Sequence, residues 1–214
     1  MTPPPRWQLA SSTSIPPAPR SYWVVPGTFL AGAYPGSPDA GQHRQRIDGL
    51  WVSGMRTFVN LMEKTERNSA GQLFTPYDDV LQQLAANSNE SAAHLRFAVR
   101  DLSVPTPAVM QSILDAVDES LKADRPVYLH CFGGVGRTGT VVCCWLLRHG
   151  FATPATVVPL LAQLRQADQL AGQRAAPETS EQIKFVESWR DLCKSDVVRT
   201  AIDEFGLPYR RLPE

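Results

Sequence analysis

The chain has 214 residues, of which 43% are hydrophobic, enough for one domain with a full core. It holds 21 basic and 21 acidic residues, so its formal net charge is zero. Nothing in that balance indicates a nucleic-acid partner or an anionic membrane surface. No apolar run approaches the roughly 20 residues that a membrane-spanning helix needs. We therefore expect no nucleic-acid partner and no membrane span. We also expect a monomer.

Residues 1–20 are rich in proline and lack the apolar core of a secretory signal. This composition predicts a flexible or extended leader, either disordered or draped over the domain, and a docking segment for a partner is the alternative. We place the folded domain at residues 21–214, with an irregular tail at 203–214.

Strands are predicted at residues 23–25, 29–32, 56–61, 95–100 and 127–130. Helices are predicted at residues 40–53, 77–86, 107–123, 137–148, 153–166 and 179–194. The third helix shows the 3.6-residue period most clearly, with apolar residues at Val109, Ile113, Leu114, Val117 and Leu121. Strands that alternate with helices predict a single α/β domain with a central, mostly parallel sheet flanked by helices. Such folds place ligands at the carboxyl ends of the strands, here after residues 127–130.

The segment that follows the last predicted strand reads His-Cys-Phe-Gly-Gly-Val-Gly-Arg-Thr-Gly, residues 130–139. Gly133, Gly134 and Gly136 allow successive backbone N–H groups to turn inward and form a concave nest. The start of the next helix adds the positive end of its dipole. A tetrahedral oxyanion such as phosphate fits this arrangement. A nucleotide-binding loop of the Gly-x4-Gly-Lys type is excluded, because the run contains no lysine.

Cys131 and Arg137 stand at the two ends of this loop. The planar guanidinium of Arg137 can grip two phosphate oxygens. The thiol of Cys131 lies among N–H dipoles and near a cation, which favours the thiolate, and a thiolate held against phosphorus is a nucleophile. The alternative is a buried apolar cysteine beside a tight turn, which we disfavour because Cys, three Gly, Arg and Thr occur in one short register.

The run from His130 to Gly139 resembles the phosphate-binding loop of the cysteine-dependent protein tyrosine and dual-specificity phosphatases, of the compact atypical type. Residues 22–25 and 29–32 are similar to the opening strands of these domains, so the resemblance covers about residues 21–194. It implies a protein tyrosine phosphatase-like fold, a phosphatase domain at 21–214, and hydrolysis through a cysteinyl-phosphate on Cys131. It also implies that Thr138 hydrogen-bonds the sulfur and that His130 braces the loop. The residues implied to hold the substrate phosphate are Phe132, Gly133, Gly134, Val135, Gly136 and Arg137.

Expulsion of an alkoxide or phenoxide needs a proton donor, which the family takes from an aspartate on an upstream loop. Asp101 matches this position, since it follows a predicted strand and precedes a proline-containing loop. A loop or capping carboxylate is the alternative. Asp48, Asp78 and Asp79 fall in predicted helices and are weaker candidates.

Gln182 is similar in position to a family glutamine that places the hydrolytic water. The alternative is a solvated residue in the first turn of a helix that Thr179 or Ser180 would cap.

The four cysteines fit neither a zinc site nor a disulfide framework, and we expect no metal and no cofactor. A catalytic thiolate needs a reducing compartment, which favours the cytoplasm. Cys143 and Cys144 are interpreted as packing residues of the helix after the loop. A disulfide between one of them and Cys131, protecting it from over-oxidation, is the alternative.

The substrate is less well determined than the reaction. Phosphotyrosine, with or without phosphoserine and phosphothreonine, is the first hypothesis, and inositol phosphates or other small phosphorylated molecules are the alternative. Phe132 and Val135 bring no cation to the loop, so extra charge would have to come from Arg96, Arg165 or Arg174. Two other classes are disfavoured: sulfur or arsenate chemistry, as in rhodaneses and arsenate reductases, and a non-catalytic phosphate-binding module, which typically lacks the Cys, the Arg or the acid.

Overall fold

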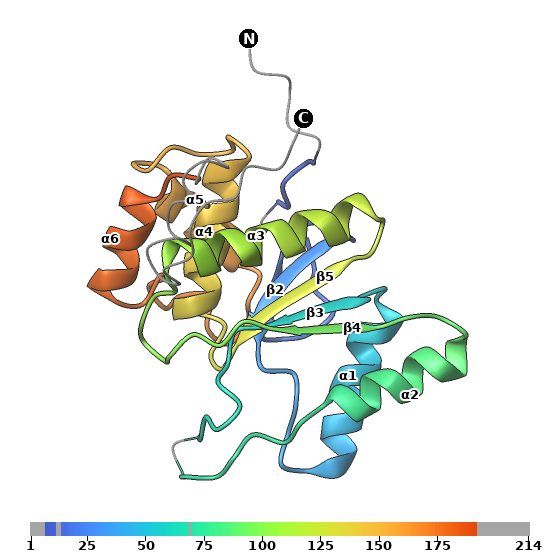
Figure 1. Ribbon diagram of the computed structural model, residues 1–214. Helices are drawn as coiled ribbons and strands as arrows, with labels where there is room; N and C mark the ends of the chain where they lie inside the picture. The colour runs from blue at the N-terminus through green and yellow to red at the C-terminus, as the bar shows by residue number, and fades with distance from the viewer. Residues whose placement is uncertain (1–6, 12–13, 69, 192–214) are drawn as a thin grey trace, which may run out of the picture.

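The computed structural model describes residues 7–11, 14–68 and 70–191. Five strands form one sheet in the order β1-β2-β5-β3-β4. β1 pairs antiparallel with β2, and every other pair is parallel (Figure 1). The strands are β1 (Ser21–Val25), β2 (Phe29–Ala33), β3 (Thr57–Asn60), β4 (Ala93–Arg96) and β5 (Val127–Cys131). The helices are α1 (Ala40–Val52), α2 (Asp78–Ser88), α3 (Pro107–Lys122), α4 (Gly136–Arg148), α5 (Val157–Arg165) and α6 (Ser180–Ser188).

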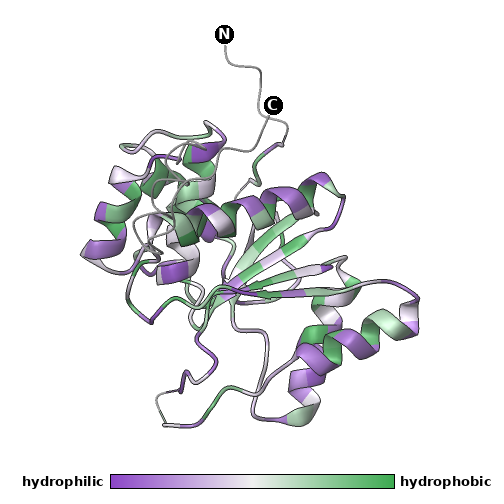
Figure 2. Cartoon of the chain, in the orientation of Figure 1, coloured by the Kyte–Doolittle hydropathy of each residue, from purple (hydrophilic) through white to green (hydrophobic). Residues whose placement is uncertain are grey.

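The helices cover both faces of the sheet. α1 and α2 lie on one face, and α3 to α6 lie on the other (Figure 1). Alternate residues of the central strands enter two separate cores, because successive side chains of a strand point to opposite faces. Leu30 and Tyr128 pack with α1 and α2, whereas Ala31 and Leu129 pack with α3 and α4. The hydrophobic residues accordingly concentrate in the sheet and on the inner faces of the helices (Figure 2). This confirms the expected α/β architecture.

Most expected elements are present with small changes at their ends, but the strand expected at residues 95–100 has the wrong bounds and lies at Ala93–Arg96. β4 ends at Arg96, and residues 97–100 have left the regular sheet. Its neighbour β3 stops at Asn60, so only isolated bonds continue, from Phe97 N–H to Asn60 O and from Val99 N–H to Leu61 O (2.9 and 3.0 Å). Phe97 packs against the core on the α3 side and Val99 is buried, so the apolar alternation continues beyond the end of the strand.

Two expected helices are shorter than the sequence indicates. α5 begins at Val157 rather than at residue 153, after a turn. α6 ends at Ser188; residues 192–194 of the expected helix, and the expected tail at 203–214, lie outside the described residues.

The start of α3 follows directly on the segment that carries Asp101. Thr106 caps the helix by accepting a hydrogen bond from the Val109 N–H (3.3 Å), and Pro107 occupies the first helical turn. These two residues fix where the preceding loop must end.

Residues 7–11 lie against the domain. The Ala10 N–H donates to the Val24 carbonyl (3.0 Å), and the Trp7 ring lies 5.4 Å from that of Trp145 and 4.8 Å from that of His149. Residues 1–6 and 12–13 of the expected leader are outside the described residues. Within the described part of the chain, no helix combines the length and the apolar character needed to cross a bilayer.

Candidate active site

The loop between β5 and α4 packs closely against β2 and α6 of the same chain. Two of its glycines therefore have no room for a side chain. Gly134 has a φ of +70°, and a Cβ there would come within 2.6 Å of the backbone of Gly32 on β2. A Cβ on Gly136 would lie 2.9 Å from the Gln182 side chain. The glycines therefore let the loop close between β2 and α6.

Cys131 is the last residue of β5 and is 3% exposed. Its Sγ accepts a hydrogen bond from the Gly134 N–H (3.3 Å), and the α4 N-terminus begins at Gly136. Cys131 opens into a cavity of about 240 Å³. Its other lining residues are Arg20, Asp101, Leu102, Phe132, Gly133, Gly136, Arg137, Arg174, Glu178 and Gln182.

Arg137 is almost completely buried beside Cys131, with a side chain 1% exposed. NH1 donates to Glu66 Oε2 (2.7 Å) and to the Val99 carbonyl (2.9 Å), and NH2 donates to Glu66 Oε1 (2.8 Å). NH2 also lies 2.9 Å from Asp101 Oδ1. Burial alone would lower the pKa of Arg137, but its hydrogen bonds to Glu66 and the charges of Cys131, Glu66 and Asp101 raise that pKa above its ordinary value. The guanidinium is thus a permanent cation at the base of the cavity.

Glu66 was not identified from the sequence. It lies in the loop after β3, and its side chain is 9% exposed. Its position beyond the carboxyl end of a central parallel strand is the signal that could have identified it, since such ends meet at one edge of the sheet.

Asp101 lies in the loop between β4 and α3, at the cavity mouth, with a side chain 55% exposed. The next residue, Leu102, has a φ of +61°, a conformation that is costly for a residue with a bulky side chain. The other aspartates considered lie on helices outside the cavity. Asp48 pairs with Arg44 and Asp78 with His94, while Asp79 lies in the first turn of α2.

His130 is fully buried behind the loop. Its Nδ1 lies 3.2 Å from the Cys131 carbonyl, which can only accept, so Nδ1 carries the proton and Nε2 accepts from the Tyr77 hydroxyl (2.5 Å). Burial lowers the pKa of His130 from 6.5 to about 3, so the ring is neutral at physiological pH. The ring therefore links the loop backbone to Tyr77 through its two nitrogens, and its bracing role stays a prediction.

The remaining loop residues divide between the cavity and the core. Phe132 is at the rim and 37% exposed, whereas Gly134 and Val135 are buried. Thr138 is fully buried, and its hydroxyl donates to the Gly32 carbonyl over a long distance of 3.4 Å. Its expected hydrogen bond to the sulfur stays a prediction.

Gln182 is fully buried, so the interpretation as a solvated residue is wrong. Its Oε1 accepts from the N–H groups of Thr179 (3.2 Å) and Glu178 (3.0 Å), and Thr179 in turn caps α6. Its Nε2 donates to the Ser103 carbonyl (3.1 Å), and the Thr179 hydroxyl donates to the Leu102 carbonyl (3.4 Å). The cap of α6 therefore holds the loop that carries Asp101.

Cys143 and Cys144 are packed in the core on α4 as free thiols. Burial raises the pKa of both thiols well above its ordinary value, which keeps them protonated. Their packing agrees with the first interpretation, and a disulfide with Cys131 stays a prediction. Cys193 lies outside the described residues.

Of the three arginines expected to add charge, only Arg174 lines the cavity, where it pairs with Glu178. Arg165 is buried and donates to the Arg174 and Ala171 carbonyls, and Arg96 donates to the Met62 carbonyl. Arg20, from the segment before β1, lines the cavity instead and was not identified from the sequence. Across residues 7–11, 14–68 and 70–191, no group of three His, Cys, Asp or Glu side chains could hold a metal ion.

Known proteins share both the sequence pattern and the fold. The human dual specificity protein phosphatase CDC14C is 25% identical over 137 residues, which are 64% of this chain and 28% of the human protein. This chain therefore matches only about a quarter of that relative's length. The solved structure of kinase associated phosphatase, with its catalytic site cysteine replaced by serine, aligns with a TM-score of 0.62 and 20% identity, covering 89% of this chain and 97% of that one. PTPMT1 in complex with PI(5)P aligns with a TM-score of 0.56 and 16% identity, covering 82% and 95%.

A family model described as "Polymorphic toxin system, DSP-PTPase phosphatase" matches residues 37–151, which run from the loop before α1 to the end of α4 and include Asp101 and the whole loop from Cys131 to Arg137. This match spans more than half of the chain. The chain belongs to the DSP-PTPase phosphatase family.

Proposed function

We propose that the chain is a dual-specificity protein phosphatase that hydrolyses phosphomonoesters through a cysteinyl-phosphate on Cys131. The observation that carries the proposal is the arrangement of Cys131, Arg137 and Asp101 around one cavity, with the Asp101 carboxylate 2.9 Å from the Arg137 guanidinium. A nucleophile, an anion-binding cation and a proton donor are the three groups that this reaction needs.

In the first step, the Cys131 thiolate attacks phosphorus, so that a P–S bond forms as the P–O bond to the leaving group breaks. Protonated Asp101 gives its proton to the leaving oxygen. The guanidinium of Arg137 and the loop N–H groups, including those of Phe132, Gly133 and Gly136, hold the equatorial phosphate oxygens. Because these donors are fixed before the reaction, they stabilise the transition state without reorganising.

In the second step, water attacks the same phosphorus while Asp101 accepts a proton from that water. The new P–O bond forms as the P–S bond breaks, which releases inorganic phosphate and the Cys131 thiolate. Thr138 stabilises the departing thiolate through its hydroxyl. The burial of Gln182 at the cavity wall, with its amide close to Gly136, supports a contribution to placing the water.

The substrate that we propose is a phosphorylated protein. Two apolar side chains, Phe132 and Leu102, stand exposed at the cavity mouth, where they can contact a peptide. The inositol-phosphate alternative draws on PTPMT1, whose structure contains PI(5)P, and on the presence of Arg20 and Arg174 at the cavity. A nucleophilic thiol also favours a reducing compartment such as the cytoplasm.

The test is release of inorganic phosphate from phosphotyrosine, phosphoserine and phosphothreonine peptides, inositol phosphates and a nucleotide. Cys131→Ser is the matched control, since it keeps the loop and Arg137. We expect release from the three peptides, none of it with Cys131→Ser, and retained phosphopeptide binding by that variant. Turnover that survives in Cys131→Ser would refute the nucleophile, and release confined to inositol phosphates would refute the protein substrate.

A further inference from the structure

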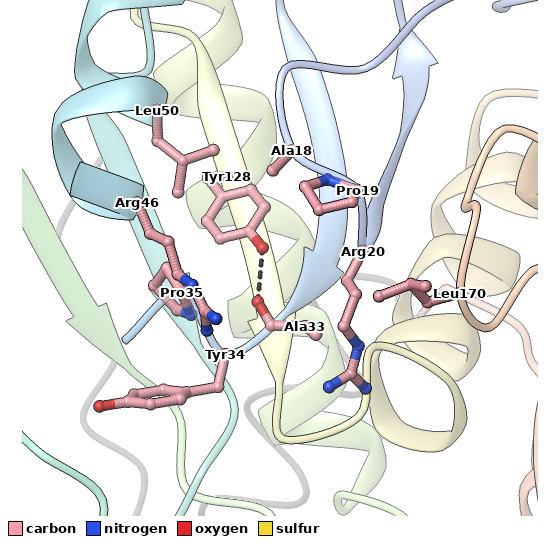
Figure 3. Close-up of a pocket in the computed structure, with 10 residues that line it drawn as sticks. All are labelled: Ala18, Pro19, Arg20, Ala33, Tyr34, Pro35, Arg46, Leu50, Tyr128 and Leu170. Atoms are coloured by element: carbon pink, nitrogen blue, oxygen red, sulfur yellow. Dashed lines mark hydrogen bonds between the residues drawn. The ribbon is translucent and has the colours of Figure 1, made fainter. Parts of the chain in front are cut away.

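A groove adjoins the candidate active site on the side of β2 and α1. It consists of two contiguous hollows of about 130 and 300 Å³ that share Arg20, Tyr34 and Arg46. Figure 3 shows Arg20 and Arg46 on opposite sides of Ala33, with the Arg20 guanidinium beside the loop that follows β5. We call this surface the Arg20–Arg46 groove.

Among the described residues, neither arginine of the groove forms an ion pair with a carboxylate. Arg20 donates to the Gly133 carbonyl (3.1 Å), and Arg46 donates to the Gly36 carbonyl (3.1 Å) and the Gln42 amide oxygen (3.2 Å). All three acceptors are neutral. The residues that line the two hollows include no Asp and no Glu. The groove is therefore a site of positive potential on a chain whose formal net charge is zero.

Three arginines of the described part illustrate the contrast, because each pairs with a carboxylate. Arg44, only two residues from Arg46 on α1, pairs with Asp48 (2.8 Å), and Arg148 pairs with Asp115 (2.7 Å). Arg174, at the active-site cavity, pairs with Glu178. Arg44 on the same helix and Arg174 at the active-site cavity are thus paired with carboxylates, whereas Arg20 and Arg46 are not.

The groove is continuous with the active-site cavity. Arg20 and Phe132 line both. From Phe132 an aromatic wall extends into the groove, with ring centroids 4.9 Å apart between Phe132 and Phe74 and again between Phe74 and Tyr34. A bound peptide that leaves the cavity over Phe132 would lie along this wall. Its side chains would then be within reach of Arg20 and Arg46.

We propose that the Arg20–Arg46 groove binds a second anionic group of a peptide substrate, a carboxylate or a further phosphate a few residues from the phosphorylated residue. The proposal rests on the phosphatase function proposed above and adds a sequence preference to it. A peptide is favoured over a polyol phosphate because aromatic side chains flank the two cations, and these suit apolar peptide side chains. The guanidinium groups are well suited to both kinds of anion.

The test uses Arg46→Gln, because Arg46 lies outside the catalytic cavity, with Arg44→Gln as the matched control on the same helix. Three phosphotyrosine peptides are compared, with Asp, Asn or phosphoserine at the flanking positions, together with nitrophenyl phosphate and an inositol bisphosphate. We expect Arg46→Gln to lower kcat/KM about 3- to 10-fold for the Asp and phosphoserine peptides. Nitrophenyl phosphate, the Asn peptide and the Arg44→Gln enzyme should be unaffected.

Charge reversal gives a second readout. Arg46→Glu should favour a peptide with Lys at the flanking positions over the Asp peptide, reversing the order of the natural enzyme. Binding of the same peptides to Cys131→Ser, measured by fluorescence anisotropy, tests the groove without turnover. A failure of the proposed phosphatase function can therefore be distinguished from a failure of the groove to bind the anionic group. Equal effects of Arg46→Gln on the Asp and Asn peptides would overturn the proposal. So would an effect confined to the inositol bisphosphate, which would assign the groove to a small-molecule substrate.

Discussion

The Glu66 carboxylate holds the Arg137 guanidinium by two parallel hydrogen bonds, from NH2 to Oε1 (2.8 Å) and from NH1 to Oε2 (2.7 Å). The pair fixes the plane of the guanidinium within a buried site. The Nε–H of Arg137 is buried without a hydrogen-bond partner among the described residues. Glu66 therefore orients a cation whose remaining donor is left for another ligand.

Glu66→Gln should lower kcat/KM for phosphopeptides about tenfold. The amide keeps the shape of the carboxylate but loses one charge-assisted hydrogen bond, and such a bond contributes about 1.5–3 kcal/mol. Steady-state kinetics should show the loss mainly in kcat, because the misplaced guanidinium fits the transition state less well. Glu63→Gln, an exposed change in the same loop, is the control. Unchanged kinetics in Glu66→Gln would mean that Val99 and the loop suffice to place Arg137.

Asp101→Asn should lower kcat by about 10²–10⁴ for phosphopeptides, whose leaving groups need a proton. The loss should be much smaller for nitrophenyl phosphate, because nitrophenolate departs without one. Comparison of the two substrates with the same enzyme isolates proton transfer from binding. Asp79→Asn, in the first turn of α2, is the control. Equal losses on both substrates would argue that Asp101 serves another role, such as holding Arg137.

The parts of the site that are local in sequence could be predicted, and those that depend on distant loops could not. The strand, the glycines, Cys131 and Arg137 occupy one short run, so their chemistry is readable from the residues alone. Glu66 reaches Arg137 across 71 residues, and Arg20 reaches Gly133 across 113. Both come from irregular segments without periodicity. The bounds of the strand expected at residues 95–100 were wrong for a related reason: its regular pairing with β3 ends at Asn60 and Arg96, which the alternation of residues 95–100 does not reveal.

Gln182→Ala should detach the Asp101 loop from α6, since it removes the Nε2–H bond to the Ser103 carbonyl and the side-chain half of the capping box. We expect a loss of about 1–3 kcal/mol in the free energy of unfolding, because buried backbone groups lose partners. We also expect a fall in kcat that is larger for phosphopeptides than for nitrophenyl phosphate, as for Asp101→Asn. Gln173→Ala, an exposed change just before α6, is the control. Equal loss on both substrates would instead indicate that Gln182 acts in the second step, which both substrates share.

His130 should make the fold less stable in mild acid. Burial holds its pKa at about 3 in the folded state against 6.5 when exposed, so below pH 6.5 the unfolded chain binds a proton that the folded chain does not. The stabilising contribution is therefore complete above pH 6.5 and is lost as the pH falls toward 3. Between pH 7 and pH 5 the loss should be about 2 kcal/mol, measured by urea unfolding at each pH.

The matched variant for this experiment is His130→Gln, whose amide does not titrate. It should be less stable than the natural chain at pH 7, because the Tyr77 hydroxyl and the Cys131 carbonyl lose well-placed partners. Its stability should change about 2 kcal/mol less between pH 7 and pH 5. Exposed carboxylates titrate alike in both chains and cancel in this difference. Parallel pH dependence in the two chains would show that His130 becomes protonated in the folded state between pH 7 and pH 5, and that its ring does not accept a hydrogen bond from the Tyr77 hydroxyl.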